Sequence, residues 1–179
     1  MSILVTGGAG FIGSHTVVEL LNAGYDVIIV DNFVNSKPEA LEAIKKITGK
    51  DFKFYKVDIV NKEELNKVFD ENPDIQAVIH FAALKAVGES VAKPIEYYEN
   101  NLNGTLSLVD CMRKHNVKKI VFSSSATVYG DPASVPIKED FPKSATNPYG
   151  QTKVMIEQIL SDIYVSDNSW SIVLLRYFN

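Results

Sequence analysis

The segment Gly7-Gly8-Ala9-Gly10-Phe11-Ile12-Gly13 follows a short apolar run, Ile3–Thr6, and precedes residues with helical periodicity. Glycines between a strand and a helix let the backbone turn sharply and leave no Cβ where a phosphate approaches the N–H groups of the helix N-terminus. The spacing therefore predicts that Gly7, Gly10 and Gly13 bind the pyrophosphate of a dinucleotide. The alternative is a turn whose glycines serve only the close packing of helix on strand.

Short apolar runs rich in β-branched residues alternate with longer segments of helical period, the pattern of parallel strands joined by crossover helices. We predict strands over Ile3–Thr6, Asp26–Val30, Phe52–Val57, Ala77–Phe81, Lys119–Phe122 and Ser171–Arg176. Helices are predicted over about Ile12–Ala23, Pro38–Thr48, Asn61 to Pro73, Pro94–His115 and from Pro148 onward. The expected fold is α/β, a Rossmann-like doubly wound parallel sheet with helices on both faces, and residues 1–179 form one nucleotide-binding domain.

The composition excludes several classes of protein. The chain has 179 residues, 46% of them hydrophobic and 22% charged, as in a single folded domain. A net charge of −4 lacks the positive field that nonspecific nucleic-acid or membrane binding needs. With one cysteine, Cys111, and no apolar run long enough to span a membrane, we expect a cytoplasmic protein without disulfides. His15, His80 and His115 lack metal-ligand spacing, so no metal site is expected, and His80 is predicted to be a core residue.

Asp31 ends the second predicted strand, 18 residues after Gly13. A carboxylate at this place accepts hydrogen bonds from the adenosine ribose hydroxyls, and a 2′-phosphate there would meet its negative charge. No arginine precedes Arg113, and Lys37 is the only nearby cation that argues otherwise, so NAD is favoured over NADP. The alternative is that Asp31 only caps the next turn. Asp58, at the end of the third strand, would face the adenine in this architecture; the alternative is an acidic strand end without a role in binding, which is common.

Tyr149 and Lys153 form a Y-x-x-x-K pattern, which places both side chains on one face of a helix with Cβ atoms about 5–6 Å apart. Lowering a phenol pKa from ~10 to ~7 requires about 4 kcal/mol. One ammonium ~6 Å away supplies roughly 3 kcal/mol at a dielectric near 20. We therefore expect Lys153, with the positive nicotinamide of NAD⁺, to make Tyr149 a usable base. The run Ser123-Ser124-Ser125 lies at the carboxyl end of the fifth predicted strand, where a hydroxyl can hold the substrate oxygen. The alternatives are a solvated helix face for Tyr149 and Lys153 and an ordinary loop for the serines.

These motifs, from Ile3 to Asn179, resemble the extended short-chain dehydrogenase/reductase family. The glycine and Y-x-x-x-K motifs identify only the superfamily. The block Lys85-Ala86-Val87-Gly88-Glu89-Ser90 and the triplet Ser125-Ala126-Thr127 narrow the resemblance to its nucleotide-sugar epimerases. It implies that Ser125 is the catalytic hydroxyl, that Tyr149 is the base, and that Lys153 binds the nicotinamide ribose and tunes Tyr149.

The resemblance also implies a set of binding residues. Besides Gly7, Gly10, Gly13, Asp31, Tyr149 and Lys153, the positions that hold NAD match Phe11, Ile12, Asn32, Asn35, Ser36, Asp58, Ile59, Phe81, Ala82, Ala83, Lys85, Asn100 and Phe178. The positions that contact the nucleotide sugar match Lys85, Ser125, Tyr149 and Asn179. The family is usually a homodimer, which by position would use about Pro94–His115 and Pro148–Val165.

The implied reaction is the 4-epimerisation of a UDP-sugar, UDP-glucose or UDP-galactose. Tyr149 takes the proton of the C4 hydroxyl while a hydride passes to tightly bound NAD⁺, and the 4-keto sugar turns over and receives the hydride on its other face. A sugar 4,6-dehydratase is the related alternative. Those enzymes carry an adjacent Asp-Glu where this chain has Ala126 and Thr127, and neither of these can perform that acid–base work.

The family continues beyond Arg176-Tyr177-Phe178-Asn179 into a smaller domain that binds the uridine diphosphate. We therefore expect the C-terminal substrate domain to be absent and residues 1–179 alone to be poorly active. The residues that decide acceptance of N-acetylated sugars fall past Asn179. The hypothesis from another class is an NAD-binding module without independent turnover.

Overall fold

A six-stranded parallel sheet in the order β3-β2-β1-β4-β5-β6 organises the computed structural model, which describes residues 1–178. The strands are β1 (Ser2–Thr6), β2 (Asp26–Asp31), β3 (Lys53–Lys56), β4 (Ile75–His80), β5 (Lys119–Ser125) and β6 (Ser171–Tyr177). The strand order reverses between β1 and β4, which is the place where doubly wound sheets bind their ligands. The predicted fold is confirmed.

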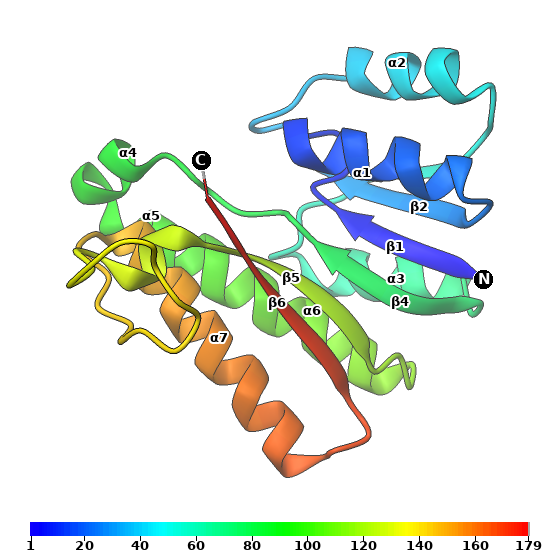
Figure 1. Ribbon diagram of the computed structural model, residues 1–179. Coiled ribbons are helices and arrows are strands. Elements are labelled where there is room, and N and C mark those ends of the chain that lie inside the picture. The colour runs from blue at the N-terminus through cyan, green and yellow to red at the C-terminus, as the bar shows by residue number, and fades with distance from the viewer. Residues whose placement is uncertain (179) are drawn as a thin grey trace.

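Helices cover both faces of this sheet (Figure 1). The α-helices are α1 (Phe11–Asn22), α2 (Glu39–Thr48), α3 (Lys62–Glu71), α4 (Val87–Ala92), α5 (Pro94–Tyr98), α6 (Gly104–Lys114) and α7 (Pro148–Ser166). A π-helical turn (Glu99–Asn103) joins α5 to α6, and a 3₁₀ turn (Ala126–Tyr129) follows β5. Helices α1 and α2 lie on one face of the sheet, and α3, α6 and α7 lie on the other.

The buried side chains form two hydrophobic clusters, one on each face of the sheet. Because successive strand residues point to opposite faces, Val27 and Ile29 of β2 pack with α1 and α2. Ile28 and Val30 belong to the cluster on the side of α3, α6 and α7. The near-continuous apolar strands of the sequence are thus explained by burial on both faces.

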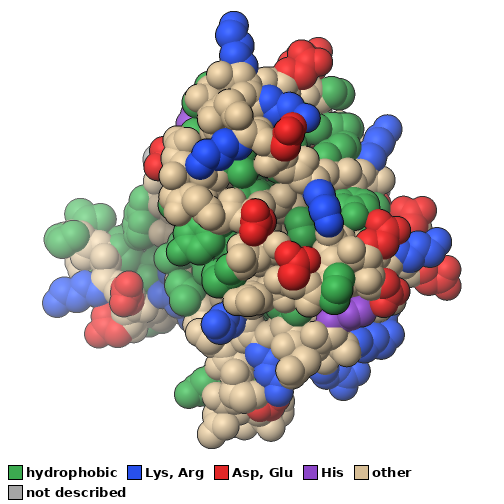
Figure 2. Space-filling view, turned by 90° about the vertical axis from the view of Figure 1, so that its right-hand side faces the viewer, with side chains coloured by type: hydrophobic (Ala, Val, Ile, Leu, Met, Phe, Trp, Pro, Cys, Tyr) green, Lys and Arg blue, Asp and Glu red, His purple; other side chains and the backbone are tan. Residues whose placement is uncertain are grey.

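The charged side chains are distributed without a broad area of one sign on the face shown in Figure 2. Lysine and arginine lie among aspartate and glutamate there. Of the helices in residues 1–178, none has the length and apolar character that crossing a bilayer requires.

The predicted elements are confirmed to within a few residues, with three differences. The strand predicted to end at Phe122 continues to Ser125, because the serines pair in register with the end of β6. The helix predicted over Pro94–His115 contains the π-helical turn. Helix α4 was not predicted, because Val87–Ala92 is short and mostly exposed. At α3 the predicted N-cap is confirmed, since the Asn61 side chain accepts a hydrogen bond from Glu64 N–H (3.3 Å).

Two glycines of the first loop are required by close backbone approach. Gly7 has φ +69°, and a Cβ there would lie 2.7 Å from Ala82 N. A Cβ on Gly13 would lie 2.2 Å from the Gly7 carbonyl oxygen. The first turn of α1 therefore packs directly on the loop, so glycine is needed here for packing and not only for a ligand.

This contact predicts the effect of one added methyl group. Gly13→Ala forces the first turn of α1 and the loop apart, and we expect the free energy of unfolding to fall by about 1–3 kcal/mol. The control is Gly88→Ala on α4, where a Cβ meets nothing within 4 Å and the helix gains from alanine. Urea denaturation followed by circular dichroism measures both, and equal stability of the two variants would contradict the prediction.

Candidate active site

A cavity of about 490 Å³ lies at the carboxyl ends of the parallel strands. Its lining includes the predicted nucleotide-binding residues Gly7, Gly10, Phe11, Ile12, Gly13, Asp31, Asn32, Asn35, Ser36, Asp58, Ile59, Phe81, Ala82, Ala83, Lys85 and Asn100. The predicted residues Ser125, Tyr149, Lys153 and Phe178 line the same cavity. Asn179, predicted to contact the sugar, lies outside the described residues. The sequence therefore identified residues that the fold brings to one place.

The Asp31 carboxylate is held in a fixed orientation at this cavity. Its Oδ2 accepts a hydrogen bond from Ala9 N–H (3.0 Å), and its Oδ1 accepts from Phe33 N–H (2.9 Å) and the Ser36 hydroxyl (2.7 Å). Asp31 therefore does cap the turn after β2, the alternative considered from the sequence. A carboxylate has about four acceptor directions, so it keeps capacity for a further donor from the cavity.

A second carboxylate, Asp58, follows the neighbouring strand β3 and lines the same cavity. Asp58 Oδ2 accepts a hydrogen bond from Asn32 Nδ2 (3.0 Å), and Asp58 Oδ1 accepts from Val60 N–H (3.0 Å). The ends of β2 and β3 are thereby linked through two predicted nucleotide-binding residues.

The loop between β1 and α1 fits a diphosphate. A Cβ on Gly10 would meet only the Gly7 carbonyl oxygen, at 3.2 Å, so its other sides are open. The first turn of α1 contains no acidic residue. Backbone N–H groups and the positive end of the helix dipole are therefore available to an anion at this point.

The other half of the cavity is formed where β5 meets α7. Ser125 is the last residue of β5, and its Oγ accepts hydrogen bonds from Thr127 N–H (3.2 Å) and the Thr127 hydroxyl (2.9 Å). The Asn147 side chain caps α7 by accepting a hydrogen bond from Gly150 N–H (2.8 Å), which places Tyr149 in the first turn. Ser125 and Tyr149 both line the cavity, and the Ser125 side chain acts to lower the pKa of the Tyr149 phenol.

Lys153 lies one turn further along α7 and is only 3% exposed. Its Nζ donates a hydrogen bond to the Ser123 carbonyl (2.8 Å) and lies 5.7 Å from the centre of the Tyr149 ring. Burial lowers the pKa of Lys153 from 10.5 to about 8. The buried ammonium thus lies close to the ring of the phenol.

The sequence argument overestimated how far Lys153 alone lowers the pKa of Tyr149. Burial raises the pKa of Tyr149 above its usual value of 10, and the interaction with Ser125 offsets this only in part. The sequence argument counted the attraction of Lys153 but left out the desolvation of a buried phenolate, which acts in the opposite direction. Tyr149 is therefore a protonated phenol at neutral pH until another positive charge approaches it.

Sequence reasoning missed the residue that joins the two halves. Asn101, in the π-helical turn, is 1% exposed. Its Oδ1 accepts a hydrogen bond from Leu84 N–H (2.8 Å), and its Nδ2 donates to Leu84 O (3.0 Å) and Thr152 Oγ1 (3.1 Å). It thereby links the cavity loop after β4 to α7. The available signal was the polar run Glu99–Asn103 inside a predicted amphipathic helix.

Two further sequence expectations concern the histidines. His80 is buried in β4, where Nδ1 pairs with the Thr6 hydroxyl (2.6 Å) and Nε2 with the Thr105 hydroxyl (3.0 Å), so its role as a core residue is confirmed. Burial lowers the pKa of His80 to about 3, so the ring is neutral. In the part of the chain that the structure describes, no group of three or more His, Cys, Asp or Glu side chains could hold a metal ion.

The sheet order, the glycine loop and the Ser–Tyr–Lys arrangement define a dinucleotide-binding Rossmann domain with an attached set of acid–base residues. The chain belongs to the NAD dependent epimerase/dehydratase family, whose model matches residues 3–179. The resemblance to nucleotide-sugar epimerases found in the sequence is therefore confirmed.

Individual relatives agree with this assignment. The UDP-glucose 4-epimerase of Bacillus subtilis (strain 168) is 64% identical over 179 residues, which are 100% of this chain and 52% of that protein. The UDP-glucose 4-epimerase of Dictyostelium discoideum is 60% identical over 177 residues. A crystal structure of the Bifidobacterium longum enzyme with NAD⁺ and UDP matches with a TM-score of 0.98 and 62% identity over 100% of this chain and 53% of that one. The chain thus spans about half the length of these relatives.

The buried ammonium predicts a pH-dependent stability. Because its pKa falls from 10.5 in the unfolded chain to about 8 in the folded one, the protonated lysine opposes folding by about 3 kcal/mol below pH 8. Lys153→Met removes this opposition together with one hydrogen bond, so we expect about 1–3 kcal/mol of stabilisation at pH 7. The gain should shrink as the pH rises from 8 towards 10.5, because the lysine then folds uncharged. Urea denaturation at several pH values tests this, and a gain that grows with pH would contradict it.

Proposed function

We propose that the protein is an NAD-dependent 4-epimerase of UDP-sugars that interconverts UDP-glucose and UDP-galactose, with residues 1–179 as its NAD-binding Rossmann domain. One observation carries the proposal: Ser125, Tyr149 and Lys153 line the same cavity as the glycine loop. The proposal is supported by the relatives named UDP-glucose 4-epimerase and by the similar crystal structure in complex with NAD⁺ and UDP.

The chain's own residues provide for the two ends of NAD. Gly7, Gly10 and Gly13 would hold the pyrophosphate, and the fixed Asp31 carboxylate would accept hydrogen bonds from the adenosine ribose. Lys153 would bind the nicotinamide ribose. When bound, NAD⁺ supplies the hydride acceptor for the reaction and a positive charge close to the phenol.

Ser125 and Tyr149 would handle the C4 hydroxyl of the sugar. Ser125 holds the oxygen, and Tyr149 takes its proton as the C4 hydrogen leaves as hydride, which gives a 4-keto sugar. Return of the hydride to the other face of the keto carbon, with the proton restored from Tyr149, gives the epimer. Lys153 stabilises the phenolate during this sequence.

A sugar 4,6-dehydratase is disfavoured by the catalytic end of the cavity. The two residues in question, Ala126 and Thr127, lie in the 3₁₀ turn, and the Thr127 hydroxyl donates to Ser125. Among the described lining residues the only carboxylates are Asp31 and Asp58, which both lie at the ends of β2 and β3. Elimination across C5 and C6 needs a further acid–base pair near the serine besides Tyr149 and Lys153, and the described lining has no carboxylate at that end.

We also propose that the protein forms a homodimer and that it is located in the cytoplasm. Exposed apolar side chains on α5, α6 and α7, including Ile95 (68%), Leu106 (47%) and Met155 (40%), support a homodimer formed through these helices. The single, buried cysteine supports a cytoplasmic location.

Tyr149→Phe tests the proposed base in the complete protein. Without the hydroxyl we expect epimerisation to slow by about 10²–10⁴-fold, while the Kd for NAD changes by less than about threefold. The control is Tyr164→Phe on the same helix, where the ring is 50% exposed. An assay coupled to UDP-glucose dehydrogenase measures the rate. Wild-type protein that binds NAD without turnover would support the binding-module hypothesis instead, and an unaltered rate in Tyr149→Phe would remove that residue from the mechanism.

Asp31→Ala tests the cofactor preference. Loss of the carboxylate removes its repulsion of a 2′-phosphate, so we expect the Kd ratio of NADP to NAD to fall by about tenfold or more. Asp26→Ala, at the exposed start of β2, is the matched control and should leave the ratio unchanged. Titrations by tryptophan or nucleotide fluorescence give both constants. The same ratio in Asp31→Ala and wild type would reject the assignment.

A further inference from the structure

Glu157 is a fully buried carboxylate on α7, one turn beyond Lys153. Its Oε1 accepts hydrogen bonds from the Ser124 hydroxyl (2.6 Å) and Arg176 Nε (3.0 Å). Its Oε2 accepts from Arg176 Nη2 (2.9 Å) and forms an ion pair with Lys143 Nζ (2.9 Å). All of its acceptor directions are therefore occupied, from three different segments of the chain.

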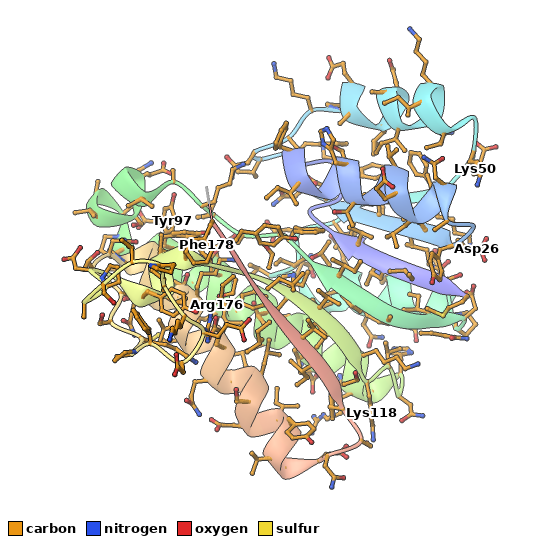
Figure 3. All side chains as sticks on the ribbon, in the orientation of Figure 1. Asp26, Lys50, Tyr97, Lys118, Arg176 and Phe178 are labelled. Atoms are coloured by element: carbon orange, nitrogen blue, oxygen red, sulfur yellow. The ribbon has the colours of Figure 1, made fainter. Side chains whose placement is uncertain are left out.

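Two of these segments, β5 and β6, carry part of the catalytic end of the cavity. Ser124 directly precedes Ser125 on β5 and lies opposite Arg176 in the register of β5 with β6. Arg176 precedes Tyr177 and Phe178, which both line the cavity. In Figure 3 the Arg176 side chain extends from β6 towards α7.

Lys143 and Arg176 also fix the segment that leads into α7. Arg176 Nη1 donates to the Tyr129 hydroxyl (2.5 Å) and to the Glu139 carbonyl (2.8 Å). Lys143 lies a few residues before the N-cap of α7. One carboxylate therefore connects β5, β6, α7 and the segment between the 3₁₀ turn and α7.

The carboxylate is ionised in spite of its burial. Burial alone favours the neutral acid, but the hydrogen bonds from Arg176, Ser124 and Lys143 outweigh it and hold the pKa of Glu157 below its usual value. A buried ion pair of this kind is weak support for stability, because apolar side chains of the same size often stabilise a protein as well or better. The ion pair does fix the geometry, because bidentate pairing with a planar guanidinium sets both the direction and the distance between the two groups.

We propose that Glu157 is a positioning residue: it fixes α7 against β5 and β6, so that the Tyr149 hydroxyl keeps its place beside Ser125 in the cavity. The expected effect of Glu157 on turnover rests on the proposed function, whereas its expected effect on the position of Tyr149 does not. Ser125 and Tyr149 come from different elements, and the contact between them depends on how those elements are held together. A displacement of about 1 Å in such a pair is enough to reduce a rate about 10²-fold.

The main test is Glu157→Gln in the complete protein. We expect kcat to fall by about 10–100-fold, with KM for the UDP-sugar and Kd for NAD changed by less than about threefold. The matched control is Asn72→Ala, because Asn72 is equally buried and makes three hydrogen bonds, to Lys53, Tyr55 and Val68, outside the cavity lining. This control should lower the melting temperature and leave kcat within about twofold. Equal losses of kcat in both variants would overturn the proposal.

Ser124→Ala is the second variant, in case Glu157→Gln does not fold. It removes only the link from β5 and leaves the ion pairs of Glu157 with Arg176 and Lys143 in place. We expect kcat to fall by about 3–10-fold with little change in melting temperature. A wild-type kcat in Ser124→Ala would overturn the proposal.

A spectroscopic measurement separates this inference from the proposed function. Protein labelled with ¹³C at tyrosine Cζ gives a Tyr149 resonance, which is assigned by its loss in Tyr149→Phe. The resonance should shift in Glu157→Gln and in Ser124→Ala and stay in place in Asn72→Ala. An unmoved Tyr149 resonance in the first two variants would overturn the proposal. Wild-type protein without epimerase activity would refute the proposed function, and the resonance would still decide the role of Glu157.

Discussion

The close approach of α1 to the Gly7 carbonyl is the contact on which the nucleotide half of the cavity depends. A Cβ on Gly13 would lie 2.2 Å from that oxygen, so only glycine allows the first turn of α1 to reach the loop. This approach places the N-terminus of α1, which is the positive end of its helix dipole, at the carboxyl ends of the strands. Asp31 then ties the same loop to β2 through Ala9 N–H. Packing and ligand binding thus require the same glycines, and the two explanations of the motif are not exclusive.

The half of the cavity between β5 and α7 contains two ionisable side chains, Tyr149 and Lys153, that folding makes harder to charge. Burial raises the pKa of Tyr149 and lowers that of Lys153 to about 8. Both groups are held there by contacts from other elements, including the Ser123 carbonyl and the Ser125 hydroxyl. Functional sites commonly break the rules that stabilise the rest of a fold, and the remaining structure compensates. The two apolar clusters that cover the sheet provide that compensation here.

Periodicity was enough to predict the strands and their parallel direction. The glycine spacing, Asp31 and the Tyr149–Lys153 pair predicted part of the cavity lining, and most of the remaining lining residues were predicted from the resemblance to the family. Such patterns could not predict contacts between segments that lie far apart in the sequence. Asn101 joins Leu84 to Thr152 through a π-helical turn that resembles ordinary helix in sequence. The pKa of Tyr149 was misjudged for the same reason, since burial depends on the packing of several elements and not on the spacing along one helix.

The buried face of α7 shows how two opposite charges four residues apart can be kept from neutralising each other. On a helix surface Lys153 and Glu157 would be natural partners. Here the carboxylate pairs with Arg176 and Lys143, and Lys153 makes no salt bridge among the described residues. Its Nζ contacts the Ser123 carbonyl instead. Because Arg176 and Lys143 pair with the glutamate, the Lys153 ammonium stays on the side of α7 that carries Tyr149, with its Nζ 5.7 Å from the centre of the phenol ring.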